Sequence, residues 1–595
     1  MSVDAIIGQR QPRLSEIDAE LGGMMQRLTA IANAPALSIK LFAEMTAILN
    51  NVSYLFLYLE SNAAHLNFDY LMPWREAFYS NRLLNQLFLT QLERFRGEDA
   101  ETENARIAYV THFRDKMEKS DIAADNAELE KLLKRTKEVL QYIDNGRLNI
   151  LQRLGAGSFT GRNEATFFNL VSSTDSPVTR SKLTRAWINA RDRWSDTLVT
   201  AIDETVATRR IQSQRRGFAS AREQTFLNAT ITSSQAKSFL NEYLIRAIEC
   251  QDTLDEEVAS ATSRSGLAMD HFAYYVRSLQ GETTVPQFIL NDCLDFIFDV
   301  ARQMFGLTFE RADRGFQHVI SVDVSRADRL CGQINFDLWD DGSPLRTTNY
   351  TFGMRNRTDF AGQVQEPVAY VSCRFKRRDG VERITFQNMH SLFHEFGHAI
   401  NHLLIKQRFP NQSGLEYLPL ERLENLSMWF EKWVFHPELC RLLPLSDSER
   451  EGLSLSQRIK KLEYRRTHVD RAVTSALDFE VNGPANITVK GAFEGLDAQY
   501  GIGRHCTLGD FLPYFSWPML TSKPGGHFAY LWGAAASAEA FVPLLVQAPN
   551  QLTNSADTDR LFADCFDTRL PSRVPQIDYA FSFYEANGAS TGRFR

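Results

Sequence analysis

Residues 394–398 read His-Glu-Phe-Gly-His, the HExxH pattern. Residues four apart lie on one face of an α-helix, so the imidazoles of His394 and His398 could reach the same ion. Two neutral imidazoles suit Zn²⁺. The carboxylate of Glu395 projects from nearly the same side and could take a proton from water at that ion. The motif therefore predicts a hydrolase centre that holds one Zn²⁺ per chain.

The helix that carries this motif is expected to be buried. Its broad apolar surface consists of Leu392, Phe393, Phe396, Ala399, Ile400 and Leu403. The alternative is a half-exposed helix with two ordinary histidines, but buried His and Glu side chains are costly unless they are paired or metal-bound. Gly397 in mid-helix costs about 1 kcal/mol relative to alanine, and the close approach of another backbone would explain it. His402, one turn beyond His398, is expected to be a packed histidine rather than a ligand.

A catalytic zinc ion needs a third protein ligand and an open position for water. Residues 420–435 have the spacing of an amphipathic helix and carry Glu421, Glu424 and Glu431. Spacing alone does not choose among these three carboxylates. Glu424 lies on or near the apolar face of the predicted helix, so burial favours Glu424 as the ligand.

The elements that must position these residues are mostly helical. Apolar residues recur at intervals of three and four over residues 13–150, 163–280, 416–475 and 529–548. Alternating apolar residues and turn signals predict a small sheet over residues 317–385, leading into the HExxH helix. We therefore expect a mainly α fold with a small β-sheet next to the zinc helix.

Strand 367–375 of this predicted sheet lies directly upstream of the HExxH helix. At the edge of the sheet it could pair with an extended peptide by strand addition, through Tyr370 and Val371. The alternative is a strand with a structural role only, and the pattern does not decide between the two. Gly526, in the glycine-containing loop 520–527, is a further expected substrate contact.

Composition and charge exclude several classes of protein. The 595 residues are 44% hydrophobic with a net charge of −7, which argues against a nucleic-acid partner. Seven scattered cysteines without a CxxC pair indicate reduced thiols. No signal peptide is apparent, and residues 529–546 are expected to form a buried core helix that stops at Pro543, not a membrane span. These features predict a cytoplasmic protein without a membrane partner.

Several stretches resemble the thimet oligopeptidase and oligopeptidase F family of zinc peptidases, among them residues 332–339 and 367–371, which are similar to its strand segments. Residues 392–399 are similar to its zinc-helix signature, and 423–435 to its third-ligand helix. The resemblance puts Glu424 on the ligand position and Glu421 where the family has an acidic residue that orients a ligand histidine. Residues 530–533, Tyr-Leu-Trp-Gly, resemble a segment whose tyrosine stabilises the transition state, a role that would fall to Tyr530.

The resemblance implies a large helical ellipsoid with a deep substrate channel, zinc on its floor, and short peptides as substrates. We expect a monomer or weak homodimer. The expected subdomains are an N-terminal helical one (1–150), a helical channel wall (151–316) and a catalytic one (317–595).

Two stretches depart from the family pattern. Residues 425–428 read Asn-Leu-Ser-Met where the family usually has Ala-Pro-Ser-Gln, and residues 522–528 replace its Gly-Tyr-Asp-Ala-x-Tyr-Tyr run. These changes leave the zinc motif intact and suggest an unusual substrate or a specialised role in a pathway.

The predicted reaction is hydrolysis of a peptide bond, with Glu395 as the general base. Tyr530 and then His527 are the candidate donors to the oxyanion, and the alternatives are a core aromatic residue and a surface-loop histidine. Two other functions stay open: a zinc amide hydrolase for a small peptide-like metabolite, and a peptide-binding homologue without catalysis. The intact HExxH residues speak against the second.

Overall fold

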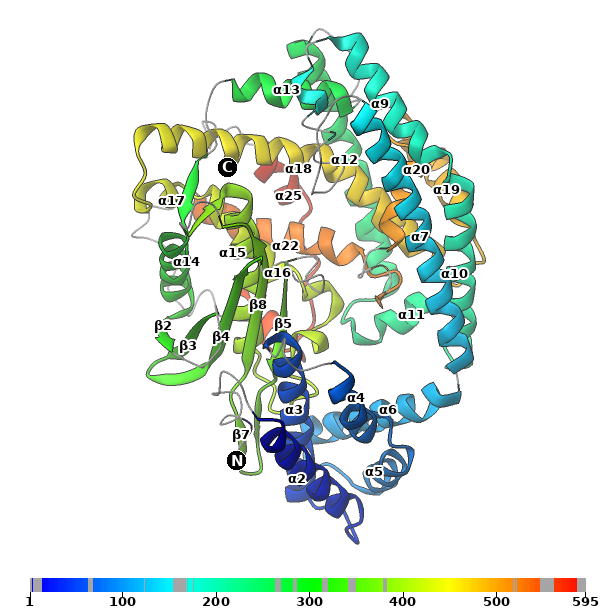
Figure 1. Ribbon diagram of the computed structural model, residues 1–595, viewed down its shortest axis with the longest axis vertical. Helices are drawn as coiled ribbons and strands as arrows, with labels where there is room; N and C mark the ends of the chain where they lie inside the picture. The colour runs from blue at the N-terminus through cyan, green and yellow to red at the C-terminus, as the bar shows by residue number, and fades with distance from the viewer. Residues whose placement is uncertain are drawn as a thin grey trace. The chain divides into compact units, whose positions relative to one another are not determined.

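The computed structural model consists of many helices and few strands, which confirms the predicted mainly α fold (Figure 1). The residues it describes are 3, 13–62, 68–121, 123–153, 167, 170–174, 176–262, 269–281, 286–312, 319–340, 349–377, 382–516, 520, 522–545 and 561–585. The predicted boundary at residues 316 and 317 lies outside them. The three predicted subdomains and the channel stay predictions.

The chain divides into two compact units, each built from three separate segments. Unit 1 comprises Met1–Ala123, Gln287–Pro444 and Gln547–Ser572. Unit 2 comprises Ala124–Pro286, Leu445–Val546 and Arg573–Arg595. The HExxH motif therefore belongs to unit 1, and the loop with His527 belongs to unit 2.

Unit 1 begins with helices that pack on one another and on the sheet. They are α2 (Leu14–Ala32), α3 (Ile39–Asn62), α4 (Phe68–Arg75), α5 (Arg82–Arg94) and α6 (Ala100–Asp121), with a π-helical turn at Glu76–Ser80. Their apolar side chains share one buried core with Met354, Val368 and Tyr370 of the sheet. This core covers one face of the sheet.

The main sheet of unit 1 has five strands in the order β2-β3-β4-β8-β5. The strands are β2 (Leu307–Ala312), β3 (Ile320–Arg326), β4 (Arg329–Trp339), β5 (Tyr350–Arg355) and β8 (Val368–Phe375). Only β4 and β8 are parallel among these neighbours, so the sheet is mixed. The sheet predicted over residues 317–385 begins too late, because β2 starts ten residues before residue 317.

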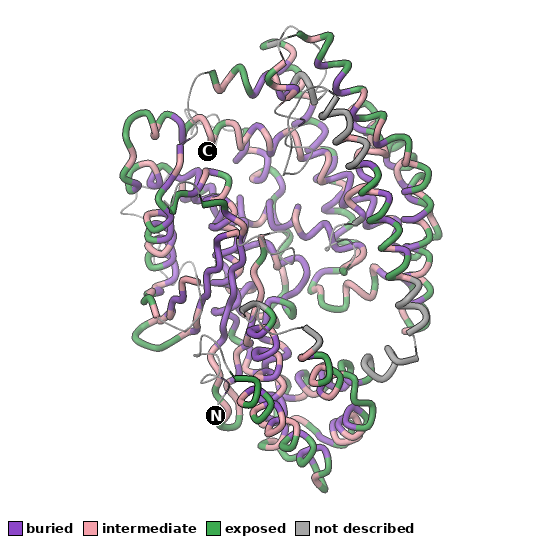
Figure 2. Tube along the Cα trace, in the orientation of Figure 1, coloured by how far each residue is buried: buried purple, intermediate pink, exposed green. Residues whose placement is uncertain are grey.

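Two-stranded pairs and further helices complete unit 1. The pairs are β1 (Gln287–Ile289) with β9 (Arg383–Thr385), and β6 (Thr358–Phe360) with β7 (Gln363–Gln365). The helices are α14 (Leu290–Phe305), α15 (Phe386–Leu404), α16 (Asn425–Glu431), α17 (Pro437–Leu442) and α24 (Ala563–Phe566). Helix α15 packs against β8, β5 and β4, and the central strands are buried in a run because both faces are covered (Figures 1 and 2).

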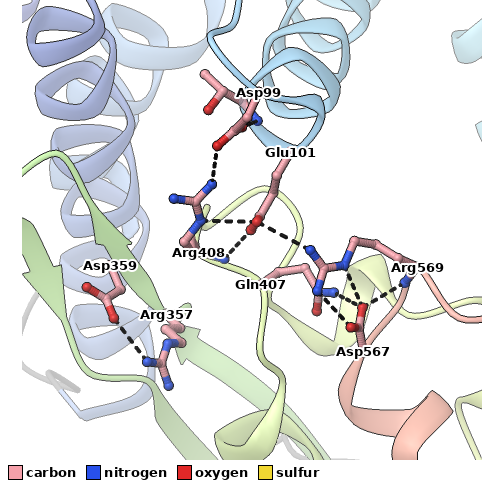
Figure 3. A network of polar contacts seen from close by, with 9 residues as sticks. Asp99, Glu101, Arg357, Asp359, Gln407, Arg408, Asp567 and Arg569 are labelled. Atoms are coloured by element: carbon pink, nitrogen blue, oxygen red, sulfur yellow. Dashed lines mark hydrogen bonds and ion pairs between the residues drawn. The ribbon is translucent and has the colours of Figure 1, made fainter.

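An ionic network ties the three segments of unit 1 together (Figure 3). Arg408, in the loop after α15, donates from Nε to Glu101 at 3.0 Å and from Nη2 to Asp99 at 2.8 Å, both near the start of α6. Glu101 also lies 3.5 Å from Nη1 of Arg569, and Arg569 pairs with Asp567. One carboxylate thus serves arginines from two distant parts of the chain.

Unit 2 is helical in the residues described. Its helices are α7 (Ala123–Arg153), α9 (Pro177–Asp192), α10 (Ser195–Arg215), α11 (Ala221–Thr225), α12 (Ser233–Thr262), α13 (Met269–Gln280), α18 (Asp447–Val481), α19 (Val489–Tyr500), α20 (Leu508–Phe511), α22 (Phe528–Leu545) and α25 (Asp578–Glu585). The long α18 begins at a capping box, in which Ser446 and Glu449 bond to each other's backbone N–H groups. It packs along α12 and contacts α22 and α25.

Helix α22 is the most apolar helix of unit 2. Among the described helices it alone is long and apolar enough to cross a membrane, with a mean hydropathy of 1.3, and 72% of that stretch is buried. Burial of this kind is typical of a core helix, as expected from the sequence. The prediction that it stops at Pro543 was wrong, because the helix continues to Leu545.

Candidate metal centre

Helix α15 carries the HExxH motif and is fixed at both its start and its middle. Thr385 precedes the helix, and its side chain accepts the N–H of Asn388, which satisfies one of the unpaired N–H groups of the first turn. In the middle, a Cβ added at Gly397 would lie 2.6 Å from Cα of Ser427 and 2.7 Å from the carbonyl oxygen of Leu426. The expected close approach of another backbone at Gly397 is thus confirmed. It brings α16 directly against the motif.

The segment that supplies the third carboxylate is not the continuous helix predicted over residues 420–435. Leu420–Arg422 and Lys432–Phe435 are 3₁₀ turns, and Glu424 precedes the short helix α16. We attribute this break to tertiary contacts of Arg422. The buried Arg422 donates to Oγ of Ser572 and to the carbonyl oxygens of Asp564 and Leu570, which holds the first turn against the segment 561–572.

Three donor atoms converge between α15 and α16. Oε2 of Glu424 lies 3.3 Å from Nε2 of His394 and 3.3 Å from Nε2 of His398. A tetrahedral zinc ion with bonds of about 2.0–2.1 Å separates its donors by about 3.3 Å, so these distances fit such an ion. All three donor atoms lie within 4.8 Å of one another. Of the three glutamates that the sequence left open, the structure brings Glu424 to the two histidines.

The charges of this cluster call for a cation. Burial opposes the charged form of His394, but the hydrogen bonds and charges of Glu424 and Glu431 outweigh it and raise the pKa of His394 well above 6.5. Burial likewise opposes the charge of Glu424, yet His398 and His394 lower the pKa of this carboxyl below its ordinary value. A metal ion replaces the proton that such a donor set would otherwise hold. The residues present therefore fit a divalent metal.

The carboxylate of Glu431 orients the imidazole of His394 through Nδ1, the ring nitrogen that does not face Glu424. Oε2 of Glu431 lies 2.8 Å from Nδ1 of His394, and an ionised carboxylate only accepts, so Nδ1–H donates. This tautomer leaves the lone pair of Nε2 for a metal. At this nitrogen Glu431 takes the place that the sequence assigned to Glu421, whose Oε1 accepts from Oγ of Ser572 at 2.6 Å. Sequence reasoning weighed Glu431 only as a ligand and missed this role.

Glu395, next to His394 on α15, is buried and does not belong to the three-donor group. Its Oε2 accepts a hydrogen bond from Oγ1 of Thr351 on β5, at 2.8 Å. A carboxylate that follows a ligand residue in the motif but is not itself a donor is free of the metal, as a general base must be.

The predicted substrate contacts on strand 367–375 are wrong. This strand is β8, which lies inside the sheet with β4 on one side and β5 on the other, so neither edge can accept a peptide. Tyr370 is 2% exposed and donates its hydroxyl to Oδ2 of Asp337 at 2.6 Å, and Val371 is fully buried. The sequence could not show that another strand, β5, continues the sheet beyond β8.

His402 is a packed histidine, as expected. It is fully buried on α15, and its Nε2 donates to the carbonyl oxygen of Arg355 at 2.9 Å. Its imidazole fills the space over Gly353 of β5, where an added Cβ would come within 2.3 Å of the ring. Burial lowers the pKa of His402 from 6.5, so the imidazole is neutral.

The remaining predicted residues, His527, Tyr530 and Gly526, lie in unit 2. His527 is 3% exposed, so the alternative of a surface-loop histidine was wrong. Burial, with a smaller contribution from Arg471, lowers the pKa of His527 to about 3. Gly526 is buried and donates its N–H to the carbonyl oxygen of Lys523, and Tyr530 is partly exposed. The substrate and oxyanion roles of these residues stay predictions.

The loop that carries His527 is fastened to α18. Asp478 accepts the N–H of Gly525 at 3.0 Å and the N–H of His527 at 3.1 Å. Nδ1 of His527 lies 2.7 Å from Oγ of Ser475, which donates its own proton to the carbonyl oxygen of Arg471. These hydrogen bonds therefore hold the backbone of the loop in place, although it contains glycines.

A second group with metal-ligand spacing consists of Asp252, Asp255 and His505 in unit 2. Nη2 of Arg504 lies 2.7 Å from Oδ2 of Asp252, and Nε of Arg504 donates to Nε2 of His505. Arg504 thus already pairs with Asp252 and contacts His505, and Nδ1 of His505 lies 3.7 Å from Oδ2 of Asp255. We therefore interpret this group as an ion-pair cluster.

Comparison with known proteins agrees with the metal centre. Residues 170–479, more than half of the chain, match the model of peptidase family M3. Oligopeptidase A of Salmonella typhimurium is 24% identical over 71% of this chain and 68% of its own length. Oligopeptidase A of Escherichia coli is 24% identical over 53% of this chain and 50% of its own length. A putative peptidase from Chlamydophila abortus shares the fold, with a TM-score of 0.56, 11% identity and 98% coverage of both chains.

The HExxH helix with its third carboxylate defines a metallopeptidase. More specifically, the chain belongs to peptidase family M3, which confirms the resemblance seen in the sequence.

Proposed function

We propose that this metallopeptidase cuts peptide bonds in short unstructured oligopeptides, with Zn²⁺ held by His394, His398 and Glu424. The observation that carries the proposal is the 3.3 Å spacing of Oε2 of Glu424 from both Nε2 atoms. When bound there, a zinc ion lowers the pKa of water to about 7 and polarises a carbonyl group. Short peptides are the class of substrate that the oligopeptidase relatives suggest by name.

Glu395 is the proposed base of the reaction. Its carboxylate takes a proton from the attacking water, the water oxygen bonds to the peptide carbonyl carbon, and the proton passes to the amide nitrogen as the C–N bond breaks. Glu431 keeps Nε2 of His394 available by accepting from Nδ1.

Tyr530 is proposed as an oxyanion donor on the resemblance alone. His527, which burial keeps neutral, stays the second candidate donor.

The strand that could hold an extended peptide is β5, in place of β8. Strand β5 ends the five-stranded sheet, and within the described residues no strand pairs with its second edge. It also lies next to Glu395, through Thr351. Main-chain hydrogen bonds to such an edge bind peptides with little regard to sequence. The cytoplasmic location, the monomeric or weakly dimeric state and the lack of nucleic-acid or membrane partners stay predictions.

The test combines a peptide digest with metal analysis. We expect the purified protein to cleave a mixed peptide library, to stop when a chelator is added, and to recover with zinc. Glu395→Gln should retain one equivalent of zinc by mass spectrometry of the metal and lose at least about a hundredfold in kcat. Glu424→Ala should lose the metal itself. Near-normal turnover by Glu395→Gln, or a full zinc complement in Glu424→Ala, would contradict the assignments. A zinc-loaded protein that cuts no peptide would point to a binding function.

A further inference from the structure

Strand β5 touches the proposed base directly. Oγ1 of Thr351 lies 2.8 Å from Oε2 of Glu395 and 2.9 Å from the main-chain oxygen of the same residue. Thr351 is half-buried, and in the sheet it stands opposite Val371 of β8. A single side chain thus links the last strand of the sheet to the middle of α15.

The hydroxyl of Thr351 has one proton to donate, and the carboxylate is the stronger acceptor. The main-chain oxygen of Glu395 already accepts in the α-helical pattern, whereas Oε2 is charged. Donation to Oε2 fixes the rotation of the carboxyl group about its last bond. Of the two carboxylate oxygens, Oε1 is then the one left to accept a proton.

The position of Thr351 is itself fixed by a second contact between the same two elements. Two residues further along β5, Gly353 has no side chain, and the ring of His402 takes that space. The same ring donates to the carbonyl oxygen of Arg355 at 2.9 Å. Glu395 and His402 are seven residues apart, about two helical turns. The strand is therefore attached to α15 at two points, and the distance from Thr351 to Glu395 is held.

We propose that Thr351 is a positioning residue for catalysis: its hydroxyl holds the Glu395 carboxylate in the orientation in which Oε1 receives the proton of the attacking water. This proposal rests on the proposed function, because it takes Glu395 as the base. It also gives β5 a second role, since the strand that could bind the peptide backbone would orient the group that acts on it.

The test compares two substitutions that differ in one group. Thr351→Val keeps the shape and the β-branch but lacks the hydroxyl, and Thr351→Ser keeps the hydroxyl. Hydrogen bonds to a charged group are among the strong ones, so we expect kcat to fall roughly tenfold to a hundredfold in Thr351→Val with little change in KM. Thr351→Ser should recover most of the rate. The matched control is Thr308→Val on β2, where an exposed hydroxyl donates to the carbonyl oxygen of Ser325.

A second measurement separates positioning from substrate binding. In the Glu395→Gln background, adding Thr351→Val should leave the zinc content and the calorimetric Kd of a short peptide unchanged. Equal kcat in wild type and Thr351→Val, or a peptide Kd that weakens tenfold in the double variant, would overturn the proposal. If instead Glu395→Gln turns over peptides normally, Glu395 is not the base and the proposed function itself is contradicted. This outcome is therefore distinct from a failure of the Thr351 proposal alone.

Discussion

At the scale of single residues, the metal centre depends on carboxylates that differ only in where they are placed. Glu424 faces two Nε2 atoms, Glu431 faces one Nδ1, and Glu395 accepts from a hydroxyl. In the proposed mechanism the same chemical group thus serves as a ligand, as an orienting acceptor and as a base. Burial makes each placement consequential, because a buried carboxylate without its partner is costly.

The orienting role of Glu431 gives a prediction about metal affinity. Glu431→Gln should weaken zinc binding about tenfold to a hundredfold, because a neutral amide holds the Nδ1–H tautomer of His394 less firmly. Competition with a chelator of known affinity measures the change. Glu421→Gln is the matched control, since its amide oxygen can still accept from Ser572 and a small loss is expected. A larger loss in the control would return the orienting role to Glu421.

The sequence predicted the chemistry of these residues better than their geometry. The HExxH spacing and the apolar face of α15 were sufficient to predict the helix, its burial and the contact at Gly397. The choice of Glu431 at His394 could not be predicted, because it depends on where the chain turns between residues 420 and 435. Thr351 gave no signal, since a threonine in a strand is ordinary.

At the scale of elements, the failures have a common cause in partners that are distant in sequence. Residues 420–435 have helical spacing, but Arg422 is drawn to the segment 561–572 and the helix is broken into short turns. Strand β8 has the pattern of a strand, but its place in the sheet follows from β4 and β5. Local patterns predict the type of an element, and long-range contacts decide its limits and neighbours.

The loop before α22, which Asp478 of α18 fastens, gives a pH-dependent prediction. Burial raises the pKa of Asp478 to about 6, although the N–H groups of Gly525 and His527 and the charge of Arg209 oppose the rise. The folded protein therefore keeps a proton that the unfolded chain releases from about pH 4 upward. The contribution of Asp478 to the free energy of unfolding is highest below pH 4, falls between pH 4 and 6, and stays low above.

Asp478→Asn should remove this dependence. Urea titration measures the free energy of unfolding of both proteins. Between pH 4 and pH 7 the wild type should lose up to about 3 kcal/mol relative to Asp478→Asn. The other charged groups named at this loop, Arg209 and Arg471, stay protonated over that range. Asn482→Ala, which removes the amide that donates to Oδ1 of Asp478, should retain the pH dependence. A constant difference for Asp478→Asn would contradict the assignment.

At the scale of the whole molecule, neither compact unit is made from one continuous stretch of chain. Unit 1 is closed by the network around Glu101, in which Arg408 and Arg569 approach one carboxylate (Figure 3). The side chain of Glu101 is 12% exposed, against 36% for Arg408 and 56% for Arg569. The network therefore lies where solvent screens it only in part.

Glu101→Gln should lower the free energy of unfolding of the protein by about 1–2 kcal/mol, because it weakens charge-assisted hydrogen bonds at a mostly buried carboxylate. Urea unfolding at moderate salt measures this. The matched control is Glu44→Gln, whose partner Arg27 is 57% exposed, and the expected loss is below about 0.5 kcal/mol. Equal losses in both variants would show that the network contributes no more than a surface pair.

The cage around Arg422 has a consequence for how the protein matures during synthesis. Its guanidinium is buried among carbonyl oxygens and a hydroxyl contributed by residues 564–572, two positions before Glu424. A ribosome that has made the HExxH helix must therefore add well over a hundred further residues before the turn that presents Glu424 has its final support. Since hydrolysis needs the assembled cluster, we expect the nascent chain to stay inert toward its own unfolded segments and toward neighbouring chains until residues 564–572 have been made.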